Sequence, residues 1–181
     1  MSTPVSVVVV ALAGLLAAAT PAAAQKVTKE AVAGVVNFAR AETTVACGGS
    51  VKPEALAEVK KYGFVSVFNL RLADEPGNDV PAEEASAKAS GLKFVSLPFS
   101  AGSPDPAVAD KFLETIMKPG YQPAFIHCAG GGRAAAMWMI KRLVVDKWDA
   151  EKAGTEAAEL GLANERLKQF ALDYAKTHVR K

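Results

Sequence analysis

Cys128 and Arg133 are the residues of this chain best suited to chemistry, because only four residues separate them: Ala129, Gly130, Gly131 and Gly132. A cysteine thiolate is a strong nucleophile, and an arginine guanidinium binds two oxygens of a phosphate-like group at once. The three glycines allow consecutive backbone N–H groups to converge on one anion. The segment therefore predicts a nucleophile, an anion cradle over residues 129–133 and a cationic clamp in one short loop.

The flanking sequence predicts a strand before this loop and a helix after it. Ala124–Cys128 is a short apolar run, and Arg133–Val145 has helical character. A helix N-terminus carries positive potential, which stabilises both a bound anion and a thiolate. His127, next to the nucleophile, has two interpretations that are equally compatible with the sequence. It either forms hydrogen bonds that support the thiolate, or it is an ordinary buried histidine.

Protonation of a leaving group requires a general acid, and Asp105 is the first candidate for it. Asp105 stands directly before Pro106, so it is equally suited to cap the N-terminus of the following helix. Asp74 and Glu75 are alternative acids. Arg71 follows a buried strand, and we expect it either to add positive charge at the rim of the pocket or to form a surface ion pair.

The rest of the chain alternates between strand and helix patterns. Strands are predicted over Thr43–Ala46, Phe64–Leu70, Leu92–Leu97 and Ala124–Cys128, and helices over Ser50–Tyr62 with Ser50 as N-cap, Pro81–Ser90, Ala107–Met117, Arg133–Val145, Asp149–Leu160 and Asn164–Val179. Val27–Ala41 is interpreted as an amphipathic helix or a turn-rich segment. This alternation predicts an α/β fold, a mainly parallel sheet flanked by helices. Core or structural roles are expected for Met137, Trp138, Met139, Trp148 and His178.

Ligands bind beyond the carboxyl ends of the strands in such sheets. The loops that contain Cys128, Arg71 and residues 99–106 all follow strand ends, so we expect them to meet at one pocket.

Residues 1–24 resemble a secretory signal peptide, with an apolar run over residues 5–19 and small residues up to an expected cleavage after Ala24. An uncleaved anchor is the alternative interpretation. Residues 25–181 then form one domain that is periplasmic or secreted, with no membrane contact after cleavage. Cys47 and Cys128 could form a disulfide in an oxidising compartment.

The composition limits the possible partners. The formal net charge is only +2, which argues against nucleic acid. Two histidines and two cysteines are too few and too scattered for a convincing zinc site, and no metal or cofactor is expected. No exposed heptad or apolar stripe indicates an oligomeric state.

Three motifs resemble the beta-lactamase-hydrolase-like phosphatase-like family, which is similar to tyrosine and dual-specificity phosphatases. They are Cys-Gly-Gly-Ser-Val-Lys-Pro-Glu at 47–54, Gly-Phe followed by Asn-Leu-Arg within 63–71, and His-Cys-Ala-Gly-Gly-Gly-Arg-Ala at 127–134. The resemblance implies a cysteine-phosphatase fold and a phosphorylated substrate or small oxyanion as partner. It also implies that Cys128 attacks phosphorus, that Arg133 clamps two oxygens, and that the loop bearing Asp105 supplies the acid.

The active loop departs from ordinary tyrosine phosphatases in two ways. Those enzymes have five residues between cysteine and arginine and a serine or threonine after the arginine, whereas this chain has four residues and Ala134. The shorter loop resembles that of rhodanese sulfurtransferases, which carry a persulfide on cysteine. Three functions therefore stay open: a cysteine-dependent phosphatase, a sulfurtransferase that uses a Cys128 persulfide, and a non-catalytic anion-binding module.

Overall fold

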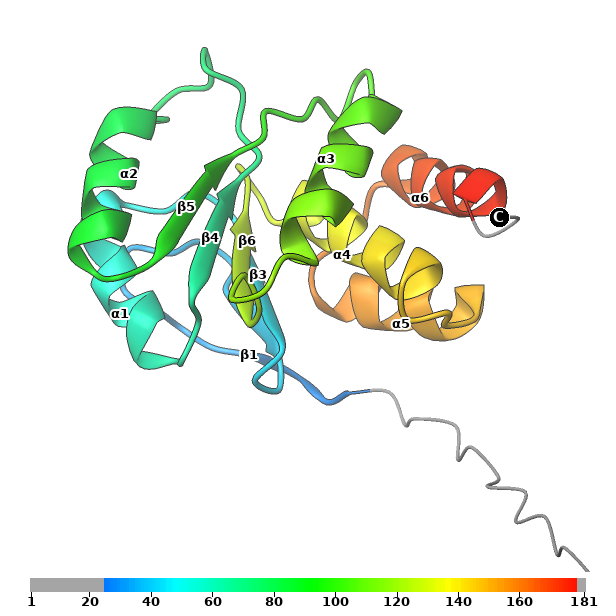
Figure 1. The fold of residues 1–181 in the computed structure, drawn as a ribbon, viewed down its shortest axis with the longest axis horizontal. Helices are drawn as coiled ribbons and strands as arrows, with labels where there is room; N and C mark the ends of the chain where they lie inside the picture. The colour runs from blue at the N-terminus through cyan, green and yellow to red at the C-terminus, as the bar shows by residue number, and fades with distance from the viewer. Residues whose placement is uncertain (1–24, 179–181) are drawn as a thin grey trace, which may run out of the picture.

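The computed structural model describes residues 25–178, so the predicted signal peptide and residues 179–181 lie outside the described part. Six strands form one sheet in the order β1-β2-β3-β6-β4-β5 (Figure 1). Their bounds are β1 Val27–Lys29, β2 Ala39–Ala41, β3 Val45–Gly48, β4 Ser66–Asn69, β5 Lys93–Ser96 and β6 Ala124–His127. The helices are η1 Pro53–Ala55, a short 3₁₀ turn, then α1 Leu56–Lys61, α2 Val80–Ala89, α3 Pro106–Ile116, α4 Gly132–Val144, α5 Ala150–Glu159 and α6 Glu165–His178.

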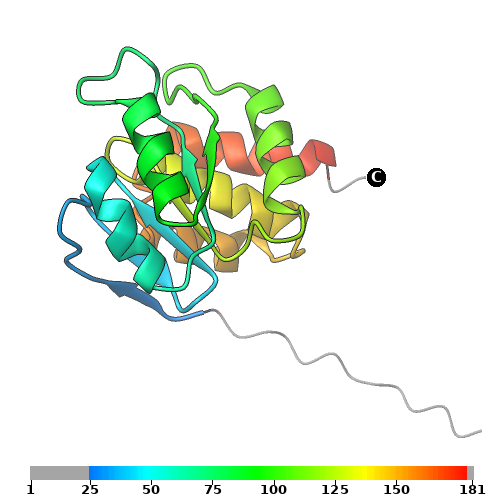
Figure 2. The same cartoon turned by 60° about the vertical axis from the view of Figure 1, so that its left-hand side comes forward.

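The sheet confirms the predicted α/β class. Strands β3, β6, β4 and β5 run parallel to one another, and β2 and β1 extend the sheet antiparallel at one edge. Helices α1 and α2 cover one face, and α3 to α6 cover the other (Figure 2). The carboxyl ends of the four parallel strands therefore open on the same edge, where the loops after β4, β5 and β6 begin.

Alternating side chains on the central strands separate two hydrophobic cores. On β6, Phe125 packs in the core beneath α1 and α2, whereas Ile126 packs in the core beneath α4. The same alternation places Cys128, just after β6, on the α4 side. Helix α4 is buried on every side from Arg133 to Leu143, which confirms the core positions expected for Met137, Trp138 and Met139.

Two cations on α4 are buried because carboxylates surround them. Lys141 pairs with Asp146, and Arg142 pairs with Glu156 and Asp146. Trp138 donates its Nε1–H to Glu156 at 2.8 Å. Arg142 also donates to Gln25 Oε1 at 2.6 Å, and the Gln25 amide donates to Thr44 at 2.8 Å. The first described residue is thereby tied to the body of the domain.

The structure corrects the sequence interpretation at the N-terminal side. The helix considered for Val27–Ala41 is wrong: β1 and β2 flank a run of turns, and Gly34 and Asn37 have positive φ that a helix does not accommodate. The strand predicted at Thr43–Ala46 runs instead over Val45–Gly48. Ser50 is not an N-cap, since the helical segment begins at Pro53 with Lys52 before it. The backbone N–H of Ser50 donates instead to Ala129.

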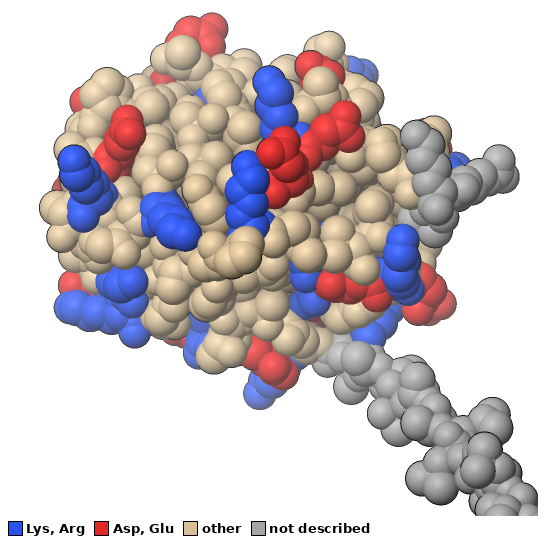
Figure 3. Space-filling model, viewed as in Figure 1, with Lys and Arg blue, Asp and Glu red and all other residues tan. Residues whose placement is uncertain are grey.

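The other predicted elements are present with ends that shift by at most two residues. The predicted helix end at Val179 lies outside the described residues. Trp148 and His178 have the structural contacts expected of them: Arg142 lies over the Trp148 ring at 4.1 Å, and His178 stacks on Tyr174. Among residues 25–178, none of the helices has the length and apolar character needed to span a bilayer. On the face drawn in Figure 3, basic and acidic side chains are interspersed.

Candidate active site

The Cys128 loop begins where β6 ends and becomes helix α4. Gly131 is the N-cap of α4 with φ of 105°, a left-handed conformation that favours glycine. This turn brings the backbone N–H of Gly131 to 3.1 Å from Cys128 Sγ. The Cys128 side chain is buried, whereas Ala129 and Gly130 are exposed. The sulfur thus lies inside the loop, at the N-terminus of a 13-residue helix.

Backbone donors around the sulfur are available for an anion. Within the described residues, the N–H groups of Ala129, Gly130, Gly132 and Arg133 donate to no protein acceptor. The first N–H groups of a helix have no intrahelical partner, and their dipoles favour negative charge. The loop is therefore able to hold an oxyanion beside Cys128 without losing an existing backbone hydrogen bond.

A second loop supports this cradle from behind. Cys128 N–H donates to Gly48 at 3.1 Å, and Ser50 N–H donates to Ala129 at 2.9 Å. A Cβ at Gly49 would lie 2.7 Å from the Ala129 carbonyl oxygen, so only glycine permits this approach. Asn37, which the sequence analysis did not single out, donates its side-chain amide to Gly130 at 3.2 Å.

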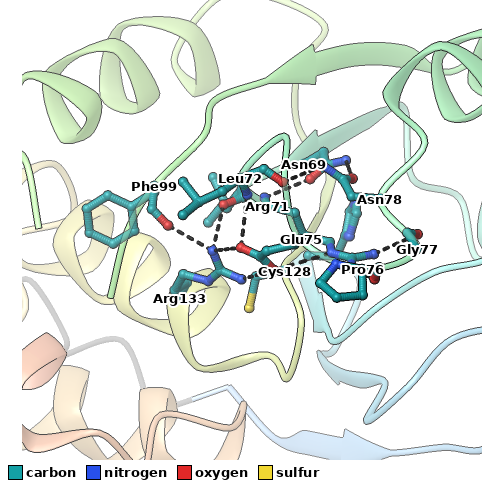
Figure 4. Close-up of polar contacts among 12 residues, drawn as sticks. Asn69, Arg71, Leu72, Glu75, Pro76, Gly77, Asn78, Phe99, Cys128 and Arg133 are labelled. Atoms are coloured by element: carbon teal, nitrogen blue, oxygen red, sulfur yellow. Dashed lines mark hydrogen bonds and ion pairs between the residues drawn. The ribbon is translucent and has the colours of Figure 1, made fainter. Parts of the chain in front are cut away.

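The guanidinium of Arg133 is held on one edge by Glu75. Nη1 donates to Glu75 Oε1 at 2.5 Å and Nη2 to Glu75 Oε2 at 2.7 Å. Nη1 also donates to the carbonyls of Leu70 and Phe99 at 3.1 and 2.9 Å. In the part of the chain that the structure describes, Nε donates to no carbonyl or carboxylate. The edge formed by Nε and Nη2 is therefore the one left for a ligand (Figure 4).

Arg133 and Glu75 each favour the charged form of the other. The hydrogen bond from Arg133 is the main cause that lowers the pKa of Glu75 from the usual 4.5 to about 2, and Leu72 N–H and Arg71 add to it against partial burial. Burial disfavours the charge on Arg133, but the Glu75 hydrogen bond and the proximity of Cys128 outweigh it and raise the pKa of Arg133. Glu75 is thus ionised at neutral pH, and a role as proton donor does not fit this arrangement.

Arg71 is not in a surface ion pair, because only 4% of the residue is exposed. Its side chain lines a hollow of about 350 Å³ together with Pro76 and Gly77. It donates to the carbonyls of Pro76 and Gly77 and lies 3.4 Å from Glu75 Oε2. Arg71 therefore shapes the loop over residues 71–78, which presents Glu75 to Arg133.

His127 lies on the opposite face of β6 from Cys128, in a buried polar group. Its Nε2 is 2.5 Å from Glu83 Oε1, and Glu83 also accepts a hydrogen bond from Asn69 at 2.8 Å. Among the described residues, the other ring nitrogen of His127 has no hydrogen-bond partner. Asn69 Oδ1 accepts from the backbone N–H of Arg71. This group links α2 and the end of β6 to the start of the Arg71 loop.

Two of the three acid candidates, Asp105 and Asp74, lie on the exposed parts of their loops. Asp105 caps α3, as one of its two predicted roles requires, with its side chain accepting from Ala107 N–H at 2.9 Å. Asp105 and Asp74 are both exposed. Arg166 on α6 donates to the Gly102 carbonyl at 2.8 Å and so holds the loop that precedes Asp105.

The two cysteines are free thiols. The register of β3 on β6 places Cys47 beside Ile126, two residues before Cys128, and both side chains belong to the core beneath α4. Burial, with the proximity of Cys128 and Glu156, raises the pKa of Cys47 well above its usual value. Among the described residues, no group of three or more His, Cys, Asp or Glu side chains could hold a metal ion.

The family of this chain follows from a match to the phosphatase-like domain of beta-lactamase hydrolase-like proteins over residues 37–145, more than half of the sequence. The chain belongs to that family. A comparison with curated proteins gives no match. The matched residues include the Cys128 loop, the Arg71 loop and the Asp105 loop.

Solved structures with the same fold are cysteine phosphatases and phosphatase-like proteins. A putative phosphatase from Shewanella putrefaciens aligns with a TM-score of 0.66 and 16% identity, over 80% of this chain and 92% of that chain. TpbA from P. aeruginosa aligns with a TM-score of 0.59 and 21% identity, over 78% and 84%. The catalytic domain of the PP-IP phosphatase SIW14 from S. cerevisiae aligns at 0.61 and 18%, over 77% and 89%. These likenesses confirm the cysteine-phosphatase fold.

Proposed function

We propose that this protein hydrolyses a phosphate monoester with Cys128 as the nucleophile. The Cys128 thiolate attacks phosphorus, the bond from phosphorus to the ester oxygen breaks, and the leaving oxygen takes a proton from Asp105. Water then attacks phosphorus and gives a proton to the Asp105 carboxylate, the S–P bond breaks, phosphate is released and the thiolate returns. Residues 129–133 donate backbone N–H groups to the phosphoryl oxygens, and Arg133 clamps two of them through Nε and Nη2.

One observation supports this proposal: the loop that holds Cys128 has unpaired backbone donors, and Arg133 at the end of the same loop keeps one guanidinium edge open. Four N–H groups of the loop have no protein acceptor in residues 25–178, and Gly131 N–H already points at Cys128 Sγ at 3.1 Å. Glu75 occupies the edge of Arg133 formed by Nη1 and Nη2, which leaves the edge formed by Nε and Nη2 to a ligand. Donors fixed in advance toward a developing charge are usually the largest part of catalysis.

Binding without turnover is the second candidate function. Ala134 is buried and has no hydroxyl to assist release of the thiolate. The Asp105 carboxylate is engaged as a helix cap, and Glu75 is held ionised by Arg133. These features fit an anion-binding protein that keeps the cradle and lacks a positioned acid.

We further propose that the chain is exported and that cleavage after Ala24 gives a mature chain of residues 25–181. N-terminal sequencing of the protein recovered from the periplasm or medium tests this. A first residue of Gln25 supports export with cleavage, whereas an intact Met1 in the cytoplasm contradicts it.

The activity is tested with the reduced mature chain in two assays, one with an aryl phosphate and one with thiosulfate plus cyanide. We expect phosphate release that disappears in Cys128→Ser and persists in Cys47→Ser, if the latter folds as judged by circular dichroism. Thiocyanate formation alone would assign the protein to sulfur transfer. Phosphate binding by calorimetry with no turnover in either assay would establish the anion-binding function instead.

A further inference from the structure

The loop over residues 71–78 is fixed at both ends by one buried side chain. Asn69, the last residue of β4, has no exposed surface. Its Oδ1 accepts a hydrogen bond from the backbone N–H of Arg71 at 2.8 Å, and its Nδ2 donates to Asn78 Oδ1 at 3.0 Å. Asn78 in turn donates to the Leu72 carbonyl at 2.8 Å. The start and the end of the loop are therefore joined through Asn69.

Helix α2 orients this asparagine through Glu83. Only 3% of Glu83 is exposed, and its Oε2 accepts a hydrogen bond from Asn69 Nδ2 at 2.8 Å. Its Oε1 lies 2.5 Å from His127 Nε2 on β6. Both Nδ2 hydrogens of Asn69 are thus engaged, one by Asn78 and one by Glu83. Because a side-chain amide has two donor hydrogens and one acceptor oxygen, its Oδ1 is left to accept from the loop.

The loop that is held in this way carries Glu75, the carboxylate that pairs with Arg133 (Figure 4). Leu72 N–H donates to Glu75 Oε1 at 2.9 Å, so the position of the carboxylate follows the local path of the loop. The carbonyl of Leu70, directly after Asn69, accepts from Arg133 Nη1 at 3.1 Å. Two of the acceptors that hold Arg133 therefore belong to the segment that begins at Asn69, although Asn69 itself does not contact the guanidinium.

We propose that Asn69 is a positioning residue that acts on Arg133 through Glu75. It does so by joining the two ends of the loop over residues 71–78, and Glu83 fixes its orientation. The inference rests on the proposed phosphatase function, in which Arg133 clamps the phosphate. The alternative is that Asn69 is a buried polar residue that stabilises the fold and has no effect on Arg133. A positioning role requires that a change at Asn69 alter the contact between Glu75 and Arg133 while the protein stays folded.

Titration of the Glu75 carboxyl carbon by NMR tests this role without any substrate. Arg133 is the main cause that lowers the pKa of Glu75 to about 2, so a misaligned pair should titrate closer to the usual 4.5. We expect Asn69→Ser, whose side chain is too short to hold both ends of the loop, to raise the midpoint by roughly one pH unit or more. Ser66→Ala is the matched control, because Ser66 is equally buried on β4 and donates at 2.5 Å to a backbone carbonyl outside residues 71–78. It should leave the midpoint near 2.

Binding of inorganic phosphate connects this positioning to the proposed function. Asn69→Ser should raise the Kd of phosphate roughly tenfold, about 1.4 kcal/mol, and Ser66→Ala should leave it within about twofold. In a Glu75→Gln background, Asn69→Ser should raise the Kd by less than about twofold, since both residues act on Arg133 through the same contact. Equal effects in the two backgrounds would overturn the inference, because Asn69 would then act independently of Glu75.

The outcomes separate the inference from the proposed function. A Glu75 midpoint near 2 in folded Asn69→Ser would overturn the inference even if phosphate binds. Wild-type protein that binds no phosphate would contradict the proposed function, and the Glu75 midpoint would still decide whether Asn69 places Glu75 against Arg133. If thermal unfolding shows that Asn69→Ser does not fold, Asn78→Ala takes its place, since Asn78 is only partly buried and joins the loop ends from outside the core. Its Glu75 midpoint should also rise, and an unchanged midpoint there would equally overturn the inference.

Discussion

Glu75 determines which edge of the Arg133 guanidinium is left open. A guanidinium has two edges that can bind an oxyanion in a bidentate manner, and Glu75 takes the edge formed by Nη1 and Nη2. Because Leu70 and Phe99 also accept from Nη1, the side chain has little freedom to rotate. In the proposed function, phosphate binding at Cys128 therefore depends on Glu75, because this carboxylate fixes the orientation of Arg133.

This pair has a defined pH dependence. The pKa of Glu75 is depressed to about 2 in the folded protein, so its contribution to stability is fully present above pH 4.5 and is lost as the pH falls toward 2. We expect the Glu75 carboxyl carbon to titrate by NMR with a midpoint near 2. Glu75→Gln has no carboxyl group at this position, so its free energy of unfolding should fall less between pH 4.5 and pH 2 than that of the wild type. A Glu75 midpoint near 4.5 would contradict the ion pair.

The two thiols should differ in reactivity. Cys47 is fully buried and its pKa is raised, whereas Cys128 lies in a loop whose neighbours Ala129 and Gly130 are exposed. The thiolate is the reactive form, so the raised pKa and the burial of Cys47 should protect it from iodoacetamide at neutral pH, and Cys128 should be modified alone through the exposed side of its loop. Peptide mapping should find Cys47 modified only after denaturation. Rapid modification of Cys47 in the folded protein would contradict its burial, and a linked Cys47–Cys128 peptide without reductant would establish the disulfide.

At the scale of elements, the site depends on how closely two loops approach each other. We expect Gly49→Ala to displace the Cys128 loop, since its Cβ would lie 2.7 Å from Ala129 O and 3.0 Å from Val36 Cβ. The expected cost is roughly 1–3 kcal/mol of stability together with weaker phosphate binding. Gly154→Ala on α5 is the matched control, because its Cβ would make only contacts of 3.9 Å. Replacing a helical glycine should leave stability equal or raise it by up to about 1 kcal/mol.

Helix α3 allows the two roles of Asp105 to be separated. Asparagine caps a helix about as well as aspartate does but cannot donate a carboxyl proton, whereas alanine does neither. Asp105→Asn should therefore unfold at the same temperature as the wild type and show slower turnover of an aryl phosphate, by roughly 10²-fold or more. Asp105→Ala should in addition lose about 1 kcal/mol of stability. Full activity in Asp105→Asn would leave Asp105 with the capping role alone.

For the whole molecule, the central elements could be predicted from the sequence because each has a strong local signal. The strand at Phe64–Leu70 is a continuous apolar run, and the helix after Asp105 has a cap and a proline where helices begin. The turns between β1 and β2 have no such signal. Their structure depends on residues with positive φ, Gly34 and Asn37, and on hydrogen bonds to distant residues such as Ser50 and Gly130.

The candidate site, like the fold, has one part that could be predicted from the sequence and one part that could not. The nucleophile, the glycines and the arginine are adjacent in sequence, so their type and spacing predicted the cradle. Glu75 is 58 residues from Arg133, and only the adjacency of β4 and β6 brings their loops together. The residue type alone made Glu75 a candidate general acid, but the ion pair with Arg133 in the fold keeps its carboxyl group ionised. The carboxyl ends of parallel strands lie on one edge of a sheet, so the sequence could predict that the loops after β4 and β6 meet. It could not predict which side chains of those loops would touch.

Gln25 enters the domain at the end opposite to the Cys128 loop. Gln25 lies beside Thr44 near the beginning of β3, because β1 pairs with β2 and β2 pairs with β3. Cys128 follows β6 at the carboxyl ends of the parallel strands, which form the opposite edge of the sheet (Figure 1). The amide of Gln25 is fixed by Arg142 and Thr44. Residues 25–181, immobilised on a sensor surface through an affinity handle before Gln25, would therefore present the Cys128 loop to the solution, and a titration of inorganic phosphate on that surface would measure binding without obstruction by the support.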